Sequence, residues 1–172
     1  MTQGLALAPA AWLLAAGARP ARGLLDLHGE VVVPVTLDDT FAFFADAWNL
    51  ERITPPWLHF EIQQPEAIEM RTGTLIDYRL RLHGVPVRWT ARIEDWRPGR
   101  EFVDRQVRGP YRLWHHRHEF VRHPDGTLVI DHVRYALPAG PLGEAAHALV
   151  VRRDLQRIFD FRADAVRQGV TA

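Results

Sequence analysis

Between residues 73 and 137 the chain is a succession of segments that alternate apolar and polar residues, separated by short turn signals. The alternating segments are 73–83, 85–96, 101–108, 111–122 and 127–137. The turn signals between them are His83-Gly84, Pro98-Gly99, Gly109-Pro110 and Pro124-Asp125-Gly126. A period of two predicts strands with one buried face, and connections this short join only antiparallel neighbours. The region therefore predicts an antiparallel sheet.

The flanking segments predict two more strands and two helices. Residues 25–35 are rich in β-branched residues, and residues 57–64 alternate, so each segment predicts a strand. Thr36 has the character of a helix N-cap, and the helix that follows must end before Pro55-Pro56. Apolar residues recur at helical spacing from Ala148 to Val166, within a run from Gly140 that predicts one long amphipathic C-terminal helix. This order predicts an α+β fold with two layers.

The length of 172 residues fits a single domain, which we expect to span residues 25–172. Residues 1–24 are expected to form an N-terminal arm outside that domain. The apolar run at 5–17 is too short to cross a bilayer, and no positive charge precedes it as in a signal peptide. We therefore expect an arm that packs on the domain or on a neighbour, in a cytoplasmic protein without a membrane span.

The composition excludes several classes of function. The chain contains no cysteine, which excludes disulfides, thiolate metal sites and a cysteine nucleophile. It contains no lysine either, which excludes Schiff-base chemistry and a phosphate-loop lysine. Its 21 basic residues, all arginine, balance 21 acidic residues. A strongly basic nucleic-acid-binding protein is therefore not expected.

The alternation assigns the side chains to two faces of the sheet. Seven arginines fall on the outer face, together with acidic residues, and predict a solvated surface: Arg79, Arg81, Arg88, Arg92, Arg105, Arg117 and Arg134. The aromatic residues and several polar residues fall on the inner face. Buried polar groups need partners or water, so their number predicts a polar-lined cavity. A connection over residues 123–126 would place His118 opposite Asp131.

Several motifs together resemble the SRPBCC (START-like) superfamily, and most closely a bacterial ligand-binding, polyketide cyclase-like subgroup. They are FADAWNLERITPPW, GTLIDYRLRLHGVPVRW, FVDRQVRGPYRLWHHRHEF, GTLVIDHVRYALP and VRRDLQRIFDFR, and they cover roughly residues 27–168. The resemblance implies a helix-grip fold, in which a curved seven-stranded antiparallel sheet wraps around the C-terminal helix and leaves a cavity. The superfamily binds lipids, sterols, polyketides and other apolar molecules, and some members are cyclases or dehydratases.

The sequence thus predicts a protein that binds a small hydrophobic or amphipathic molecule between the sheet and the C-terminal helix. The candidate ligand-binding residues are Tyr78, Trp89, Phe102, Asp104, Gln106, Arg108, Trp114, His116, Tyr135, Leu155 and Phe159. Aromatic and aliphatic residues at such positions are more often plain core. Asp104 and Gln106 could contact the polar end of a ligand, and Arg108 could meet a carboxylate at the rim.

Two other interpretations remain open at this stage. His118 and Asp131 could form an acid/base pair in a cyclase- or dehydratase-like enzyme, or could simply satisfy each other in the core. His116 and His118 could bind a metal ion with Asp131 or Asp104, although we expect no metal and no cofactor. The arm at 5–17, with Leu128 and Ile130 on the outer face, could form a homodimer contact.

Overall fold

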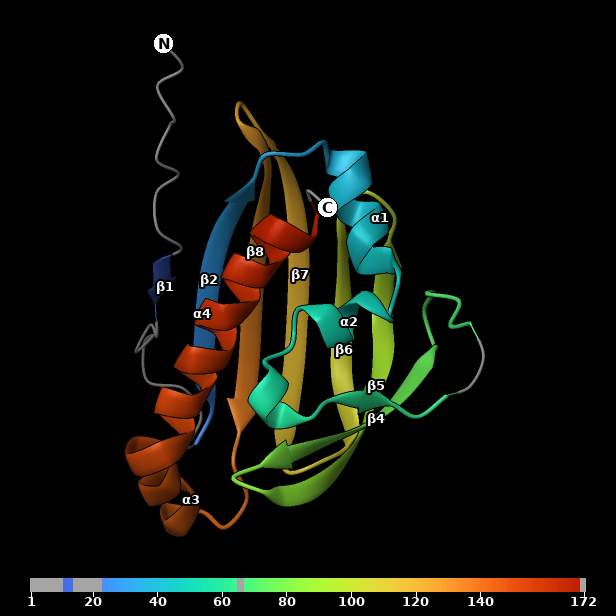
Figure 1. Ribbon diagram of the computed structural model, residues 1–172. Helices are drawn as coiled ribbons and strands as arrows, with labels where there is room; N and C mark the ends of the chain where they lie inside the picture. The colour runs from blue at the N-terminus through green and yellow to red at the C-terminus, as the bar shows by residue number, and fades with distance from the viewer. Residues whose placement is uncertain (1–10, 14–22, 65–66, 171–172) are drawn as a thin grey trace.

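The computed structural model describes residues 11–13, 23–64 and 67–170, and these residues form a curved antiparallel sheet with helices on its concave face (Figure 1). The strand order is β1-β2-β8-β7-β6-β5-β4-β3. The strands are β1 (Ala11–Leu13), β2 (Leu25–Val33), β3 (Glu61–Ile62), β4 (Leu75–Leu82), β5 (Val85–Arg97), β6 (Glu101–Arg108), β7 (Leu113–His123) and β8 (Gly126–Ala136). Strands β2 to β8 are the seven that the sequence predicts, and the α+β helix-grip fold is confirmed.

Strand β1 comes from the N-terminal arm and pairs with the edge of β2, with Trp12 opposite Gly29. These three residues add an eighth strand to the sheet, which the sequence did not predict. Apart from residues 23 and 24, the rest of the arm lies outside the described residues, and the domain boundary at residue 25 stays a prediction.

The helices are α1 (Leu37–Ala45), α2 (Asn49–Arg52), the 3₁₀ turn η1 (Pro56–Leu58), α3 (Pro141–Ala146), the π-helical turn η2 (His147–Val151) and α4 (Arg152–Gly169). The Thr36 hydroxyl accepts a hydrogen bond from the Asp39 amide, as an N-cap does. The first predicted helix is divided at Asp46, whose carboxylate accepts from the Trp48 amide and competes with the helical pattern. None of the helices in the described part of the chain is long and apolar enough to span a membrane.

Two predicted elements differ from those observed. Residues 57–64 contain only the two-residue strand β3, because Pro55-Pro56 starts a 3₁₀ turn and His59 then adopts a left-handed conformation with φ 44°. The C-terminal helical run begins as expected but contains η2, a π-helical turn between α3 and α4. Such turns insert one extra residue into the helical ladder, which periodicity in the sequence does not reveal.

Helix α4 lies over the concave face of the sheet on the side of β2 and β8 (Figure 1). Its buried side chains are Leu155, Phe159, Ala163 and Val166, at the spacing of one helical face. Leu155 and Phe159 belong to a core cluster with Trp89 and Trp114 of the sheet. A second cluster at the other end joins α1 to the sheet, and includes Phe41, Phe44 and Phe120. Between the two clusters, the inner face of the sheet carries its polar residues.

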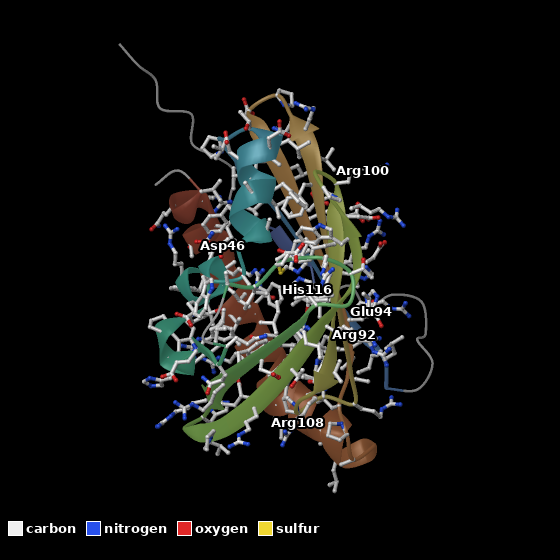
Figure 2. All side chains as sticks on the ribbon, turned by 90° about the vertical axis from the view of Figure 1, so that its right-hand side faces the viewer. Asp46, Arg92, Glu94, Arg100, Arg108 and His116 are labelled. Atoms are coloured by element: carbon white, nitrogen blue, oxygen red, sulfur yellow. The ribbon has the colours of Figure 1, made fainter. Side chains whose placement is uncertain are left out.

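The register between β7 and β8 places His118 directly opposite Asp131, which confirms the predicted pairing. The outer face of the sheet carries arginines beside acidic residues, as predicted. Arg79 lies 2.7 Å from Glu61, and Arg105 lies 3.1 Å from Glu94. Figure 2 shows Arg92 and Glu94 on this outer face, away from His116 in the interior. These ion pairs support the interpretation of a solvated surface.

Candidate functional site

A cavity of about 180 Å³ lies between the sheet and α4. Its walls come from β4 to β7, from the α1–α2–η1 segment and from α4. Most of the wall is apolar, with side chains such as Leu80, Trp89 and Ile158. Its ionisable groups include Asp104 and Arg162. The molecule therefore has a largely apolar cavity in which a few polar groups could orient a ligand.

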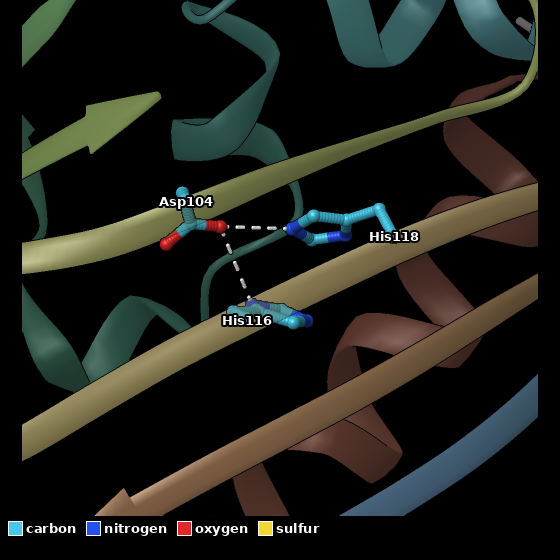
Figure 3. A group of neighbouring side chains, drawn as sticks. All are labelled: Asp104, His116 and His118. Carbon is cyan, nitrogen blue, oxygen red and sulfur yellow. Dashed lines mark hydrogen bonds and ion pairs between the residues drawn. The ribbon is translucent and has the colours of Figure 1, made fainter. Parts of the chain in front are cut away.

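Two histidines and two aspartates from three neighbouring strands form a cluster beside the cavity. His118 Nε2 lies 2.9 Å from Asp104 Oδ2, and His118 Nδ1 lies 2.7 Å from Asp131 Oδ1. His116 Nε2 lies 2.8 Å from the same Asp131 oxygen. Figure 3 shows one oxygen of Asp104 facing both imidazoles, and this oxygen lies 3.6 Å from His116 Nδ1. Each histidine thus lies between the two carboxylates.

These contacts determine how the cluster holds its protons. A carboxylate only accepts hydrogen bonds, so the Nε2 atoms of His116 and His118 both donate. Burial lowers the pKa of His118, but the charge of Asp131 and the hydrogen bond to Asp104 outweigh it, and the net shift is upward. Burial, with the charge of His118, lowers the pKa of His116 to about 4. The cluster therefore favours the proton on His118 over His116.

The two aspartates are held in their ionised form. Burial raises the pKa of each carboxyl group, but the opposing effects of the two histidines, joined at Asp104 by the charge of Arg162, are larger in sum. For Asp104 the main opposing effect is the hydrogen bond from His118, and the net pKa is lowered. For Asp131 it is the charge of His118, and the net pKa lies well below the usual value. The cluster can therefore store one proton between two carboxylates, next to an apolar cavity.

Most of the residues that the sequence singled out lie in the cavity wall. They are Tyr78, Trp89, Phe102, Asp104, Trp114, His116, His118, Leu155 and Phe159. The structure brings them together from four strands and one helix. Asp131 lies behind the histidines, at 3 % exposure, where it can orient them but does not line the cavity.

Three other candidates lie away from the cavity. The Gln106 amide donates to the Tyr111 carbonyl at 2.7 Å and accepts from the Tyr111 amide, so it closes the β6–β7 turn. The Tyr135 hydroxyl is 2.8 Å from His147 Nε2 and connects β8 to η2. Arg108 pairs with Thr90, because one extra residue in β6, Val107, shifts the register there. The shift turns Arg108 to the outer face, and Figure 2 shows it at the far end of the sheet.

Sequence reasoning missed part of the cavity wall. The α1–α2–η1 segment contributes Leu50, Ile53 and Leu58, which belong to helical turns too short to show a clear period. Arg162 on α4 also lines the cavity. The sequence signal for Arg162 was its charge within the apolar stripe of the C-terminal helix, because charged residues are rarely buried unless they are paired.

The cluster also contains the atoms of a candidate metal site. One ligand atom each from Asp104, His116 and His118 lie within 4.8 Å of one another. A metal ion would have to displace the proton of His118, whose 2.9 Å contact with Asp104 has the length of a hydrogen bond. The positive charge of Arg162, which acts on Asp104, opposes a second cation there. The residue types fit a metal ion, but the distances fit a shared proton better.

Comparison with known proteins identifies the family. The family described as polyketide cyclase / dehydrase and lipid transport matches residues 33–161, which is more than half of the chain. The chain belongs to this family. The resemblance to the SRPBCC superfamily is thereby confirmed, and the family supports a function in ligand binding or in cyclase-like chemistry. A search of curated protein sequences finds no match.

Solved structures share the fold at low sequence identity. The protein TTHA0849 from Thermus thermophilus matches with a TM-score of 0.65 and 19% identity, over 85% of this chain and 97% of that chain. The Zhui aromatase/cyclase from Streptomyces sp. R1128 matches with a TM-score of 0.61 and 18% identity, over 84% of this chain and 95% of that chain. Ara h 8.0201 matches with a TM-score of 0.61 and 14% identity, over 87% of this chain and 99% of that chain. At these identities the comparison establishes the fold alone.

Proposed function

We propose that this protein binds a small, largely apolar molecule in the cavity between the sheet and α4. The observation that carries the proposal is the cavity itself, which is slightly larger than the engineered apolar cavity of about 150 Å³ that accepts benzene. A compact core would have filled this space, because protein interiors pack as densely as organic crystals. A cavity of this size suits a ligand of one or two rings, or a short branched chain.

An unpaired polar atom in the cavity wall supports the same proposal. Trp89 lines the cavity, and its buried indole N–H has no hydrogen-bond partner among the described residues. Buried donors in folded proteins nearly always have a partner, so such an atom calls for a ligand or an ordered water molecule. A bound molecule with one acceptor group would satisfy it.

The test combines native mass spectrometry with a variant that fills the cavity. We expect the freshly purified protein to carry an organic molecule that is lost on denaturation, or to bind added naphthamide, a neutral two-ring probe. Ala91→Leu would place a larger side chain in the cavity wall and should weaken naphthamide binding at least tenfold. Its neighbour Thr90 faces the outer side, where its hydroxyl bonds Asp77, so Thr90→Leu is the matched control. A folded protein that neither carries nor binds such a molecule would refute the proposal.

A second candidate function is proton transfer on the bound molecule, which the position of His118 favours. His118 lines the cavity, and Asp131 behind it stabilises the protonated imidazole, as in a general acid/base pair. The hydrogen bond from His118 to Asp104 means that a substrate must compete for that proton or receive it through Asp104. Cyclisation and dehydration both need a proton to move next to a carbonyl group, which this arrangement could supply.

Hydrogen–deuterium exchange next to the carbonyl of tetralone, a bicyclic ketone, tests this second candidate. A positioned acid/base group contributes about 10²- to 10⁴-fold to a rate, so His118→Gln should remove at least that lower factor. Naphthamide binding should survive the same substitution, which separates catalysis from binding. If exchange in the presence of the protein does not exceed that in buffer, the protein is a binding protein alone. A cytoplasmic location and a homodimer stay predictions from the sequence.

A further inference from the structure

Arg162 is a charged group of the cavity wall that has no charged partner among the described residues. It lies on α4, one turn after Ile158, and both residues line the cavity. No described residue forms an ion pair or a hydrogen bond with it, and its Nε atom is buried and unsatisfied. Its guanidinium carbon lies 6.0 Å from the centroid of the Phe44 ring, and its charge acts on the cavity residues Tyr78 and Asp104.

Arginines elsewhere on the molecule contrast with Arg162. On the sheet, Arg79 and Arg105 each lie beside a glutamate, and both arginines are exposed. On α4 itself, Arg167 pairs with Asp164 at 3.1 Å. Surface arginines gain little from such pairs. Arg162 is partly buried, and its Nε is cut off from water without a partner, which is unfavourable for a polar group. The cavity wall thus contains an arginine whose buried Nε has no partner among the described residues.

The nearest acidic group of the cavity does not fill this role. The charge of Arg162 contributes to the lowered pKa of Asp104, so the two groups influence each other. They are more than 4.0 Å apart, however, which is too far for an ion pair. Asp104 already accepts the hydrogen bond from His118 at 2.9 Å. The N–H groups of the Arg162 guanidinium can therefore donate hydrogen bonds to a molecule that occupies the cavity.

We propose that the ligand is a small apolar carboxylic acid and that Arg162 binds its carboxylate. This inference rests on the proposed binding function and names its ligand class. The planar guanidinium matches a carboxylate with two parallel hydrogen bonds, and the apolar wall around Trp89 and Leu155 accommodates the ring or chain. A phosphate fits less well, because its second charge would face Asp104 with a single guanidinium to balance it.

The test compares naphthoate with naphthamide, which have the same rings and differ in charge. The intact protein should bind naphthoate at least tenfold more tightly than naphthamide in a calorimetric or fluorescence titration. Arg162→Gln should weaken naphthoate binding at least tenfold and change naphthamide binding less than twofold, and Arg162→Lys should retain part of the preference. Arg153 is exposed on the same helix, so Arg153→Gln should leave both affinities unchanged.

The outcomes separate this inference from the function on which it rests. Equal affinities of the intact protein for acid and amide would overturn the assignment of Arg162 and leave the binding function standing. An equal loss of both ligands in a folded Arg162→Gln would also overturn it, since the side chain would then only support the cavity wall. Failure of the intact, folded protein to bind either probe would overturn both proposals. Thermal unfolding followed by circular dichroism establishes that each variant is folded.

Discussion

The buried carboxylate of Asp131 should contribute more to stability than any other single polar side chain of the cluster. Its side chain is 5 % exposed and lies within 2.8 Å of two imidazole nitrogens. Replacing it in Asp131→Asn keeps the volume but leaves the protonated His118 with one carboxylate instead of two. Removing one partner of a buried ion pair costs about 3 to 5 kcal/mol. For a domain of this size, that loss lowers the midpoint of thermal unfolding by about 6 to 20 °C.

The chain provides a matched control on the opposite face of the sheet. Asp26 lies 3.1 Å from His132 across β2 and β8, where the two side chains are 28 % and 41 % exposed. Asp26→Asn should cost less than about 1 kcal/mol, because exposed pairs contribute little. Urea unfolding of both variants at neutral pH measures the difference. A loss below about 1 kcal/mol for Asp131→Asn would refute the interpretation that His118 is protonated and held by two carboxylates.

Three further predictions concern the same region. The unfolding free energy should fall by up to about 3 kcal/mol as the pH drops from 6.5 to about 4. The reason is that His116 binds a proton readily in the unfolded chain, whereas its folded environment disfavours the charged form. Urea titrations should show a smaller fall in His116→Gln. His118 should not contribute to this fall. Its raised pKa stabilises the folded protein fully below pH 6.5, and this stabilisation is lost only as the pH rises. Leu155→Ala should cost about 2 to 5 kcal/mol in urea unfolding and enlarge the cavity, whereas an unchanged stability would contradict its burial in the wall. Elemental analysis should find no stoichiometric transition metal; a bound metal that His118→Ala releases would contradict the shared-proton interpretation.

The fold was predictable from sequence because its signals are local and repeat along the chain. Each strand from β4 to β8 has one apolar face, and each connection is a short turn, so pairing and order follow from neighbours in sequence. The His118–Asp131 pairing followed for the same reason, since a short hairpin determines its own register. The α1–α2–η1 segment was predicted less well, because a carboxylate at Asp46 and two prolines override its periodicity.

The site was less predictable because its members depend on positions that are far apart in the sequence. The cavity is the space that α4 leaves against the sheet, and neither its volume nor its lining follows from the pattern of one strand. Arg162 shows the difficulty: the spacing places it on the inner stripe of the helix, but only the structure shows that its charge has no partner among the described residues there. Asp131 shows the opposite difficulty. Alternation places it correctly on the inner face of the sheet, but it lies behind the histidines and does not line the cavity.

Two extra residues in the strands explain why simple alternation fails next to the site. The β5–β6 register shifts twice, at Glu94 on β5 and at Val107 on β6. Each shift exchanges the inner and outer faces beyond it, so Arg108 turns outward, while Trp96 turns inward against Phe102. Bulges of this kind also increase the local twist of a sheet, which a sheet that wraps around a helix requires. Asp104 lies on β6 before the shift at Val107, so it keeps the inner face that it shares with Phe102 and stays within reach of both histidines.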